Sequence, residues 1–386
     1  MKKINKLINQ DHLYIESDNL FALEHLIDKY KNRINLIYID PPYNTGNSYV
    51  YNDCFSDYKG FTWSEMMSPR LELAKSLLAE DGAIFISIDD NELVNLRLIC
   101  DNIFGKENFI ANIIWQKKYS QSNDSYTMST VHEYIIVYQK TSNFRINLLP
   151  RNENLNKPYK NDDGDGKGVW RQDNLLVKKF SLSRVYPIVN PNTGKEYYPP
   201  NGNSWRASKE TMNKWLQENR IYFGQKGTGA PQLKRYLNEV KQGVLPTTFW
   251  SYDEVGHTQQ ANKEITSLFN NELVFDTPKP VSLIKKILQI ASKHNDIILD
   301  FFAGSATTAH ATLELNSEDG GNRKFIMIQS PEHCNFKNKK FKNRFKYISD
   351  IGKERINRAG KLLLQKTSYH PNWDKNVSFK FIKMQG

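Results

Sequence analysis

The sequence contains little cysteine and no long apolar run. Its three cysteines, Cys54, Cys100 and Cys334, lie far apart and form no CxxC pair. Neither a disulfide framework nor a zinc site is indicated, so we expect free thiols and no bound metal. No stretch approaches the roughly 20 apolar residues that span a bilayer, and the first residues lack the apolar core of a secretory signal. We therefore expect a cytoplasmic protein without membrane contact.

Positive charge is in excess. The chain carries 53 Lys and Arg against 42 Asp and Glu, a formal net charge of +11. This balance favours a polyanionic partner, although charge alone does not separate nucleic-acid binding from an ordinary basic surface. A length of 386 residues is enough for one large core with a smaller lobe.

Strands and helices alternate in the first and last thirds of the chain. Apolar runs predict strands at 13–17, 35–40, 83–89, 109–115, 133–138, 296–302 and 323–329. Helical spacing predicts helices at 19–30, 64–79, 92–104, 280–292, 307–316 and 348–364. Alternation of this kind predicts an α/β fold with a mostly parallel sheet.

The middle of the chain differs in character. Residues 141–274 are rich in Asn, Gly, Lys, Pro and aromatic residues and show no sustained period. Tryptophans at 170, 205, 215 and 250 argue against a disordered insert, because this side chain is costly to leave in water. We therefore expect three parts, namely residues 1–140, a folded lobe at 141–274, and residues 275–386.

The first chemical motif is Asp40-Pro41-Pro42-Tyr43, which begins at the acid that ends the nearly all-apolar run 35–40. Ligands of open α/β sheets bind at the carboxyl ends of the strands. The two prolines fix the backbone and lack N–H donors. The Asp40 carboxylate and the Pro41 carbonyl can then accept from the NH₂ group of a flat heterocycle, on which the Tyr43 ring can stack. A rigid turn alone would explain an isolated Pro-Pro-Tyr, but the acid after an apolar strand favours a catalytic site.

The second motif is the small-residue turn from Asp300 to Thr308, between an expected strand and an expected helix. Such a turn lets a ligand approach the backbone beside a helix N-terminus. Any strand–helix unit needs a similar turn, so the motif is only moderately specific. The two motifs are too distant along the chain for one βαβ unit, so the sheet must bring them together.

As a set, the motifs resemble β-class DNA adenine-N6 methyltransferases, in which the catalytic motif precedes the cofactor motif. The resemblance is closest to the modification (Mod) subunits of type III restriction–modification systems, and it covers roughly 1–140 and 275–365. The matching stretches are 40–46, 80–92, His132-Glu133-Tyr134, Pro278-Lys279-Pro280, 300–308 and 350–356. The resemblance implies a circularly permuted, seven-stranded, Rossmann-like methyltransferase sheet, with 141–274 as the inserted target-recognition domain.

The same resemblance implies the cofactor S-adenosylmethionine and a target adenine flipped out of duplex DNA. The implied catalytic residues are Asp40, Pro41, Pro42 and Tyr43. The implied cofactor-binding residues are Asp18, Lys279, Pro280, Asp300, Phe301, Phe302, Ala303, Gly304, Ser305, Thr308 and Gln329. Expected DNA contacts are Asn44, Lys117 and Lys118, although a solvated basic loop explains the two lysines equally well. Double-stranded DNA is the expected partner, and a homodimer and a restriction subunit are further family expectations.

Two positions depart from the family pattern. Ala306 stands where the second glycine of the cofactor loop is usual, and an alanine held at positive φ costs on the order of 1 kcal/mol. We expect Ala306 to be already helical and harmless, because a helix is predicted from Thr307. Gln329 stands where many methyltransferases place an acid for the ribose hydroxyls. It can still accept one hydrogen bond, or Glu332 can replace it.

Three alternative functions stay open at this point. Cytosine-N4 methylation uses the same geometry, but that family usually has Ser where Asp40 stands. Methylation of RNA or of a protein amide is the second, and an asparagine in place of Asp40 would favour the amide version. The third is a catalytically silent DNA-binding module, suggested by Ala306 and Gln329. Methyl transfer to duplex DNA separates the enzyme from the silent module.

Overall fold

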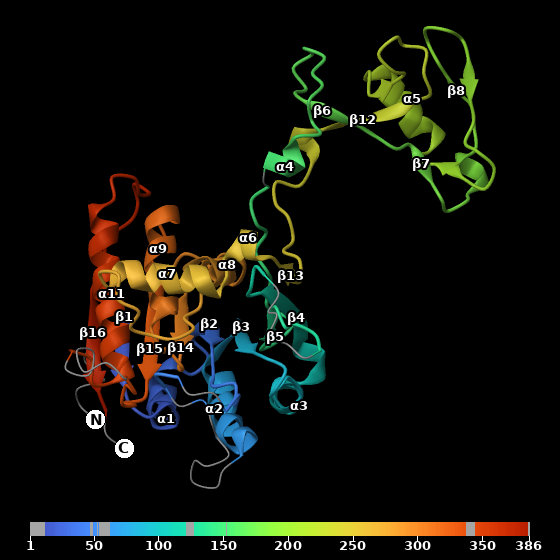
Figure 1. Cartoon of the computed structure of the whole chain (residues 1–386). Helices are drawn as coiled ribbons and strands as arrows, with labels where there is room; N and C mark the ends of the chain where they lie inside the picture. The colour runs from blue at the N-terminus through green and yellow to red at the C-terminus, as the bar shows by residue number, and fades with distance from the viewer. Residues whose placement is uncertain are drawn as a thin grey trace. The chain divides into compact units, whose positions relative to one another are not determined.

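The computed structural model describes residues 12–46, 49–51, 53, 62–120, 127–151, 153–336 and 344–384 (Figure 1). The chain forms two compact units, one within 1–147 and 246–386 and the other at 148–245. The second unit is shorter than the expected lobe at 141–274. Residues 246–274 belong to the first unit, where they add strand β13 (Phe249–Trp250), helix α6 (Tyr252–Val255) and helix α7 (Thr258–Leu268). A two-residue strand carries too little periodicity to be recognised in sequence.

A large sheet forms the centre of the first unit. Among the described residues it has nine strands in the order β13-β4-β5-β3-β2-β14-β15-β1-β16. The strands other than β13 are β1 (His12–Glu16), β2 (Ile34–Ile39), β3 (Leu78–Ile88), β4 (Phe109–Gln116), β5 (His132–Gln139), β14 (Ile297–Asp300), β15 (Lys324–Gln329) and β16 (Phe379–Lys383). Only β5 runs antiparallel to its neighbours, β3 and β4, so the expected mostly parallel α/β sheet is confirmed.

Seven of these strands, from β4 to β1, correspond to the expected sheet, and two edge strands exceed it. Strand β16 pairs in parallel with β1, and β13 pairs in parallel with β4. Strand β2, from the first third of the chain, lies directly beside β14 from the last third, with Leu36 opposite Ile298. The two sequence motifs therefore follow adjacent parallel strands.

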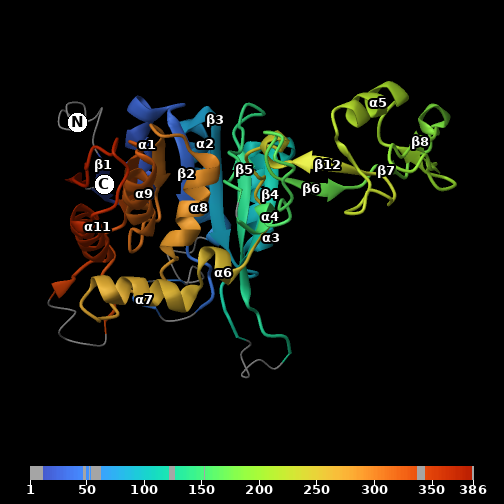
Figure 2. The same ribbon diagram turned by 90° about the horizontal axis from the view of Figure 1, so that it is seen from above.

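Helices cover both faces of the sheet (Figures 1 and 2). On one face, α1 (Asn19–Tyr30) packs against α2 (Trp63–Leu77), and α2 packs against α3 (Leu93–Phe104). On the other face, α8 (Val281–Ala291) packs against α9 (Thr307–Asp319), and α9 packs against α11 (Ile348–Gln365). Helix α7 contacts α11, and α6 contacts α8. The short 3₁₀ turn η1 (Lys106–Asn108) links α3 to β4.

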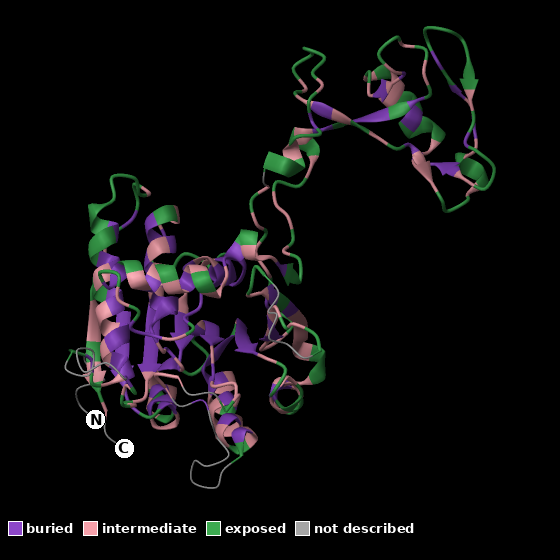
Figure 3. Cartoon of the chain, viewed as in Figure 1, coloured by how far each residue is buried: buried purple, intermediate pink, exposed green. Residues whose placement is uncertain are grey.

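Burial explains why the central strands are almost entirely apolar. Leu36, Ile37 and Ile39 of β2 are fully buried, as are Ile298 and Leu299 of β14 (Figure 3). A parallel strand covered by helices on both faces has no solvated side, so alternation with polar residues is absent. This core fixes the two strand ends from which the site is built. Among the described residues no helix is both long and apolar enough to cross a bilayer.

The second unit has an apolar core of its own. Tyr186, Trp205, Met212 and Phe223 are buried in it, and the Trp205 indole donates to the Tyr186 carbonyl at 2.7 Å. Its described helices are α4 (Glu153–Asn156) and α5 (Lys209–Gln217), with the 3₁₀ turns η2 (Leu182–Arg184) and η3 (Leu237–Glu239). An antiparallel sheet contains β11 (Ile221–Tyr222), β12 (Gln232–Tyr236) and β6 (Trp170–Asp173). Two further strand pairs join β7 (Leu176–Val177) to β10 (Ser204–Trp205) and β8 (Ile188–Val189) to β9 (Glu196–Tyr197).

Candidate active site

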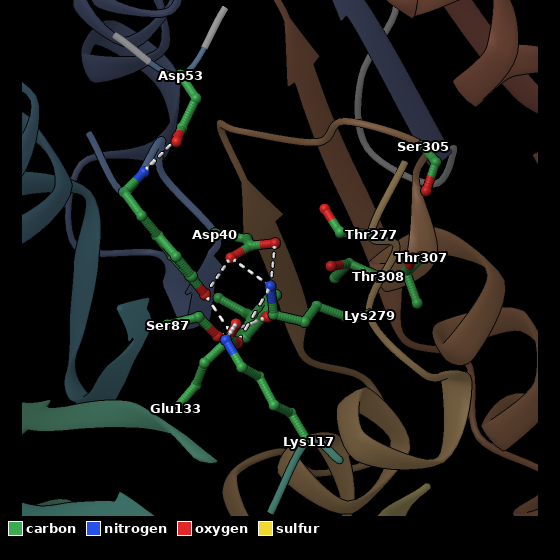
Figure 4. Close-up of polar contacts among 12 residues, drawn as sticks. Asp40, Asp53, Ser87, Lys117, Glu133, Thr277, Lys279, Ser305, Thr307 and Thr308 are labelled. Atoms are coloured by element: carbon green, nitrogen blue, oxygen red, sulfur yellow. Dashed lines mark hydrogen bonds and ion pairs between the residues drawn. The ribbon is translucent and has the colours of Figure 1, made fainter. Parts of the chain in front are cut away.

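A cleft of about 1230 Å³ opens where β2 and β14 end. Its walls include residues 40–43 after β2, most of the turn 300–308 after β14, and Lys279 from the segment before α8. Figure 4 shows some of these side chains, with Asp40 and Lys279 close together and the hydroxyl residues Ser305, Thr307 and Thr308 to one side. The sheet therefore brings together the two motifs that the sequence singled out.

Asp40 is held by two side chains. Lys279 Nζ donates to both of its carboxylate oxygens, at 2.8 and 2.6 Å, and the Tyr43 hydroxyl donates to Oδ1 at 2.9 Å (Figure 4). Burial raises the pKa of Asp40 above its ordinary value, and the Lys279 charge only partly opposes this. The carboxylate is thus a strong, desolvated acceptor at the end of β2.

A second carboxylate, Glu133, lies in the same cluster. It accepts from Lys117 Nζ at 2.7 Å and from the Tyr43 hydroxyl at 3.2 Å, and Lys279 Nζ is 3.7 Å away. Burial alone would raise the pKa of Glu133, but Lys279 and Lys117 outweigh it and lower that pKa. Two lysines and two carboxylates therefore form a charge-balanced cluster around Tyr43. In the sequence, Glu133 appeared only as part of a matching stretch, although an acid inside an apolar strand is itself a signal.

Backbone contacts fix the loop that carries Asp40. The Tyr43 amide donates to Asp53 Oδ1 at 2.7 Å, and the Trp63 indole donates to the Pro42 carbonyl at 2.7 Å. Trp63 opens α2, whose N-terminus is closed by a capping box of Thr62 and Glu65. The N-terminal residue of α2 thereby fixes the position of the loop. The Tyr43 ring, expected as a stacking surface, is oriented here by its hydroxyl contacts to the two carboxylates.

Buried polar contacts organise the turn after β14. Thr308 Oγ1 donates to Asp300 Oδ2 at 2.5 Å, and the Phe302 amide donates to Asp300 Oδ1 at 3.1 Å. Burial raises the pKa of Asp300 to about 7. The Gly304 amide donates to Gln329 Oε1 at 2.7 Å. Gln329 thus holds the turn, in addition to lining the cleft.

The expectation that Ala306 is helical is wrong. Ala306 is the N-cap residue of α9 with φ 62° and ψ 41°, which is the left-handed region, and it is fully buried. Its amide donates to the Ala303 carbonyl at 2.6 Å, so the chain reverses inside the turn before the helix begins. A helix that starts at Thr307 leaves the preceding cap residue outside helical geometry. The position therefore has the conformation that favours glycine.

Comparison with known proteins gives the family. A family profile described as DNA methylase matches residues 34–359. The chain belongs to the DNA methylase family. It is 35% identical to the type II methyltransferase M.KpnI of Klebsiella pneumoniae, over 92% of this chain and 89% of that protein. It is 39% identical to the StyLTI Mod subunit of a type III restriction-modification enzyme from Salmonella typhimurium strain LT2, over 91% of this chain.

The chain spans 57% of the length of that Salmonella relative. Among solved structures, the cytosine-N4-specific PvuII DNA methyltransferase aligns with 93% of this chain and 97% of its own, at 10% identity and a TM-score of 0.44. The family that the motifs indicated is thus confirmed by the matches in sequence.

The cleft of this methylase-family chain is lined by two of three further residues expected at the cofactor, Asp18 and Lys279 but not Pro280. Lys279 lines the cleft, where its Nζ donates to both carboxylate oxygens of Asp40. Pro280 is the buried N-cap residue of α8, and it does not line the cleft. Asp18 does line the cleft, where it caps α1 through the Phe21 amide and pairs with Arg70 at 3.4 Å.

Of the three residues expected to contact DNA, two line the cleft and one does not. Lys117 is bound to Glu133 inside the cleft, whereas Lys118 is exposed on its wall. Asn44 has φ 60° and donates to Glu92 Oε1 at 2.9 Å, outside the cleft lining. Sequence reasoning missed Asn19. The side-chain Nδ2 of Asn19 donates to the Phe301 carbonyl at 2.9 Å. Asn19 thereby ties the start of α1 to the turn after β14.

Proposed function

We propose that the protein transfers a methyl group from S-adenosylmethionine to the N6 amine of a flipped-out adenine in duplex DNA. The observation that carries the proposal is the position of Asp40, a half-buried acceptor at the end of β2, beside the turn that follows β14. Family membership supplies the reaction class, and the cleft supplies a place for both reactants. Pocket volumes for one ligand are about 300–1,000 Å³, so a cleft of about 1230 Å³ has room for a cofactor and a base.

The turn 300–308 suits the cofactor. Gly304 lines the cleft with φ +50°, and a side chain there would come within 3.3 Å of the Phe275 ring, so the position favours glycine. Phe302, Ser305, Thr308 and Gln329 line the same wall. When bound, S-adenosylmethionine supplies the electrophilic methyl group. The chain's own residues then hold and orient the two reactants.

Asp40 is the acceptor we assign to the adenine amine, with the Pro41 carbonyl as the second. Lys279 occupies both Asp40 oxygens but lies only 3.7 Å from Glu133, so a small rotation transfers its charge to Glu133 and opens Asp40. Two acceptors on the amine hydrogens direct the nitrogen lone pair toward the methyl group. Forming the new C–N bond would break the bond between the methyl carbon and sulfur, whose electron pair stays on sulfur, and one N–H proton must then leave the nitrogen. Asp40, whose pKa burial raises, is placed to accept that proton.

DNA is the substrate we assign to the basic second unit. Residues 148–245 hold 17 Lys and Arg against 9 Asp and Glu, which is +8 of the chain's +11. Contacts to phosphates account for most sequence-independent affinity for DNA. We therefore assign target recognition to this unit within the region 141–274. A homodimer and a restriction subunit stay predictions.

The proposal is tested by incubating the purified protein with duplex DNA and isotopically labelled S-adenosylmethionine, followed by mass spectrometry of the nucleosides. We expect label in N6-methyldeoxyadenosine. Label in N4-methyldeoxycytidine would overturn the choice of base. DNA binding without any label transfer or cofactor binding would favour the silent DNA-binding module.

A further inference from the structure

A buried arginine lies directly behind the turn after β14. Arg355 of α11 is 0% exposed, and its Nη1 donates to Ser305 Oγ at 2.9 Å and to Thr307 Oγ1 at 2.7 Å. Its Nε and Nη2 are buried without a hydrogen-bond partner. Within the part of the chain that the structure describes, no carboxylate lies within ion-pair distance of this guanidinium.

Helix α11 is built to approach the turn closely. One helical turn before Arg355, a side chain on Gly352 would meet the Gly304 carbonyl at 3.1 Å and the Tyr14 hydroxyl at 2.5 Å. Only a residue without Cβ allows this approach, which brings Arg355 within reach of Ser305 and Thr307. The acid that acts most on Arg355 is Glu264, and its Oε2 already accepts from the Val281 amide at 3.0 Å. Burial lowers the pKa of Arg355 to about 10, so the guanidinium is charged at neutral pH.

An unpaired charge inside a protein is costly, because desolvation is not offset by a counterion. Ser305 and Thr307 connect this charge to the cleft wall, because both hydroxyl oxygens accept from Arg355 and both residues line the cleft. A hydroxyl has one hydrogen to donate, and its oxygen can accept. Since both oxygens accept from Arg355, both hydrogens are left for a ligand in the cleft, which Ser305 and Thr307 line (Figure 4). The N-terminus of α9 begins at Thr307 and adds a positive end to the same wall.

We propose that Arg355, Ser305 and Thr307 form a relay that holds the carboxylate of the cofactor's amino-acid end. Both hydroxyls are left as donors toward the cleft, with the Arg355 charge behind them, and this suits an anion and not a cation. The inference rests on the proposed function and adds a positioning residue, Arg355, which acts through the two hydroxyls. It also gives a role to residues 350–356, which matched the family without an assigned purpose.

The test compares binding of two ligands by calorimetry. S-adenosylmethionine carries the carboxylate, and its decarboxylated form lacks only that group. We expect the wild type to prefer the first ligand, and Arg355→Met to weaken its binding on the order of 10- to 100-fold, the range of a charge-assisted hydrogen bond. Binding of the decarboxylated ligand should change less than about threefold, because a group that cannot contact the relay loses nothing. Arg355→Lys should restore part of the preference.

The control is Arg358→Met on the same helix. Arg358 pairs with Glu354 at 2.6 Å and does not line the cleft, so the preference should stay as in the wild type. Ser305→Ala provides a second test that keeps Arg355 in place and should reduce the preference by itself. Equal weakening of both ligands in Arg355→Met and Ser305→Ala would overturn the relay. If the wild type binds neither ligand, the proposed function fails; if it binds both equally, only the relay fails.

Discussion

Replacing Ala306 by glycine tests the conformation of the cofactor turn. Ala306 has φ 62° and is fully buried. Relief of left-handed strain stabilises the variant by about 1–2 kcal/mol. Greater freedom of the unfolded chain costs about 0.4–1 kcal/mol, and the lost methyl group costs about 0.8 kcal/mol. These contributions nearly cancel, so we expect the free energy of unfolding to change by less than about 0.5 kcal/mol.

Ala306→Val distinguishes a left-handed backbone at this position from a helical one. A β-branched side chain is strongly disfavoured in the left-handed region, and Ala306 is fully buried in an apolar cluster. We expect a loss of about 2–4 kcal/mol in denaturant unfolding from strain and overpacking together. If the valine variant is as stable as the wild type, or the glycine variant gains well over 1 kcal/mol, the reasoning about this turn is refuted.

Three further predictions concern the acids of the cleft. Asp40→Asn should lower methyl transfer by at least about 100-fold while the calorimetric affinity for S-adenosylmethionine stays nearly unchanged; equal loss of both would argue against its role as amine acceptor. Glu133→Gln removes a charge that raises the pKa of Asp40, so the acidic limb of the pH–rate profile should move to lower pH, and a shift upward would contradict the cluster. Burial raises the pKa of Asp300 to about 7, which favours its protonated form in the folded protein, so stability should decline as pH rises from about 4 through 7. Asp300→Asn should reduce that decline in melting curves between pH 5 and 8, and an unchanged slope would exclude Asp300 as its source.

The sequence predicted the central sheet well because its strands are buried on both faces. The run 35–40 is apolar between Asn35 and Asp40, and it appears as β2 at Ile34–Ile39. The sheet brings the two sequence motifs together as expected, because they follow the adjacent strands β2 and β14. Edge strands were missed for the converse reason. Strand β16 (Phe379–Lys383) mixes apolar and charged residues on a partly exposed edge, which leaves a weak pattern.

Side-chain partners across the chain could not be predicted. Lys279 and Asp40 form an ion pair although they are 239 positions apart in the chain, so the local sequence contains no sign of it. The conformation of Ala306 was missed because helix propensity at Thr307 says nothing about the backbone of the cap before it. Arg355 lies in the helix that the sequence predicts at 348–364, yet only the fold shows that this side chain is buried while other basic residues of α11, such as Lys361, are exposed.

The central claim is that the Asp40 cluster directs methylation to adenine N6 in DNA. The most direct measurement is sequencing that detects methylated bases in DNA from cells that express either the wild-type protein or Asp40→Asn, at matched protein levels. We predict N6-methyladenine at one recurring sequence context with the wild type and its loss with Asp40→Asn. Methylated cytosine in that context, or the same adenine signal in both strains, would contradict the account.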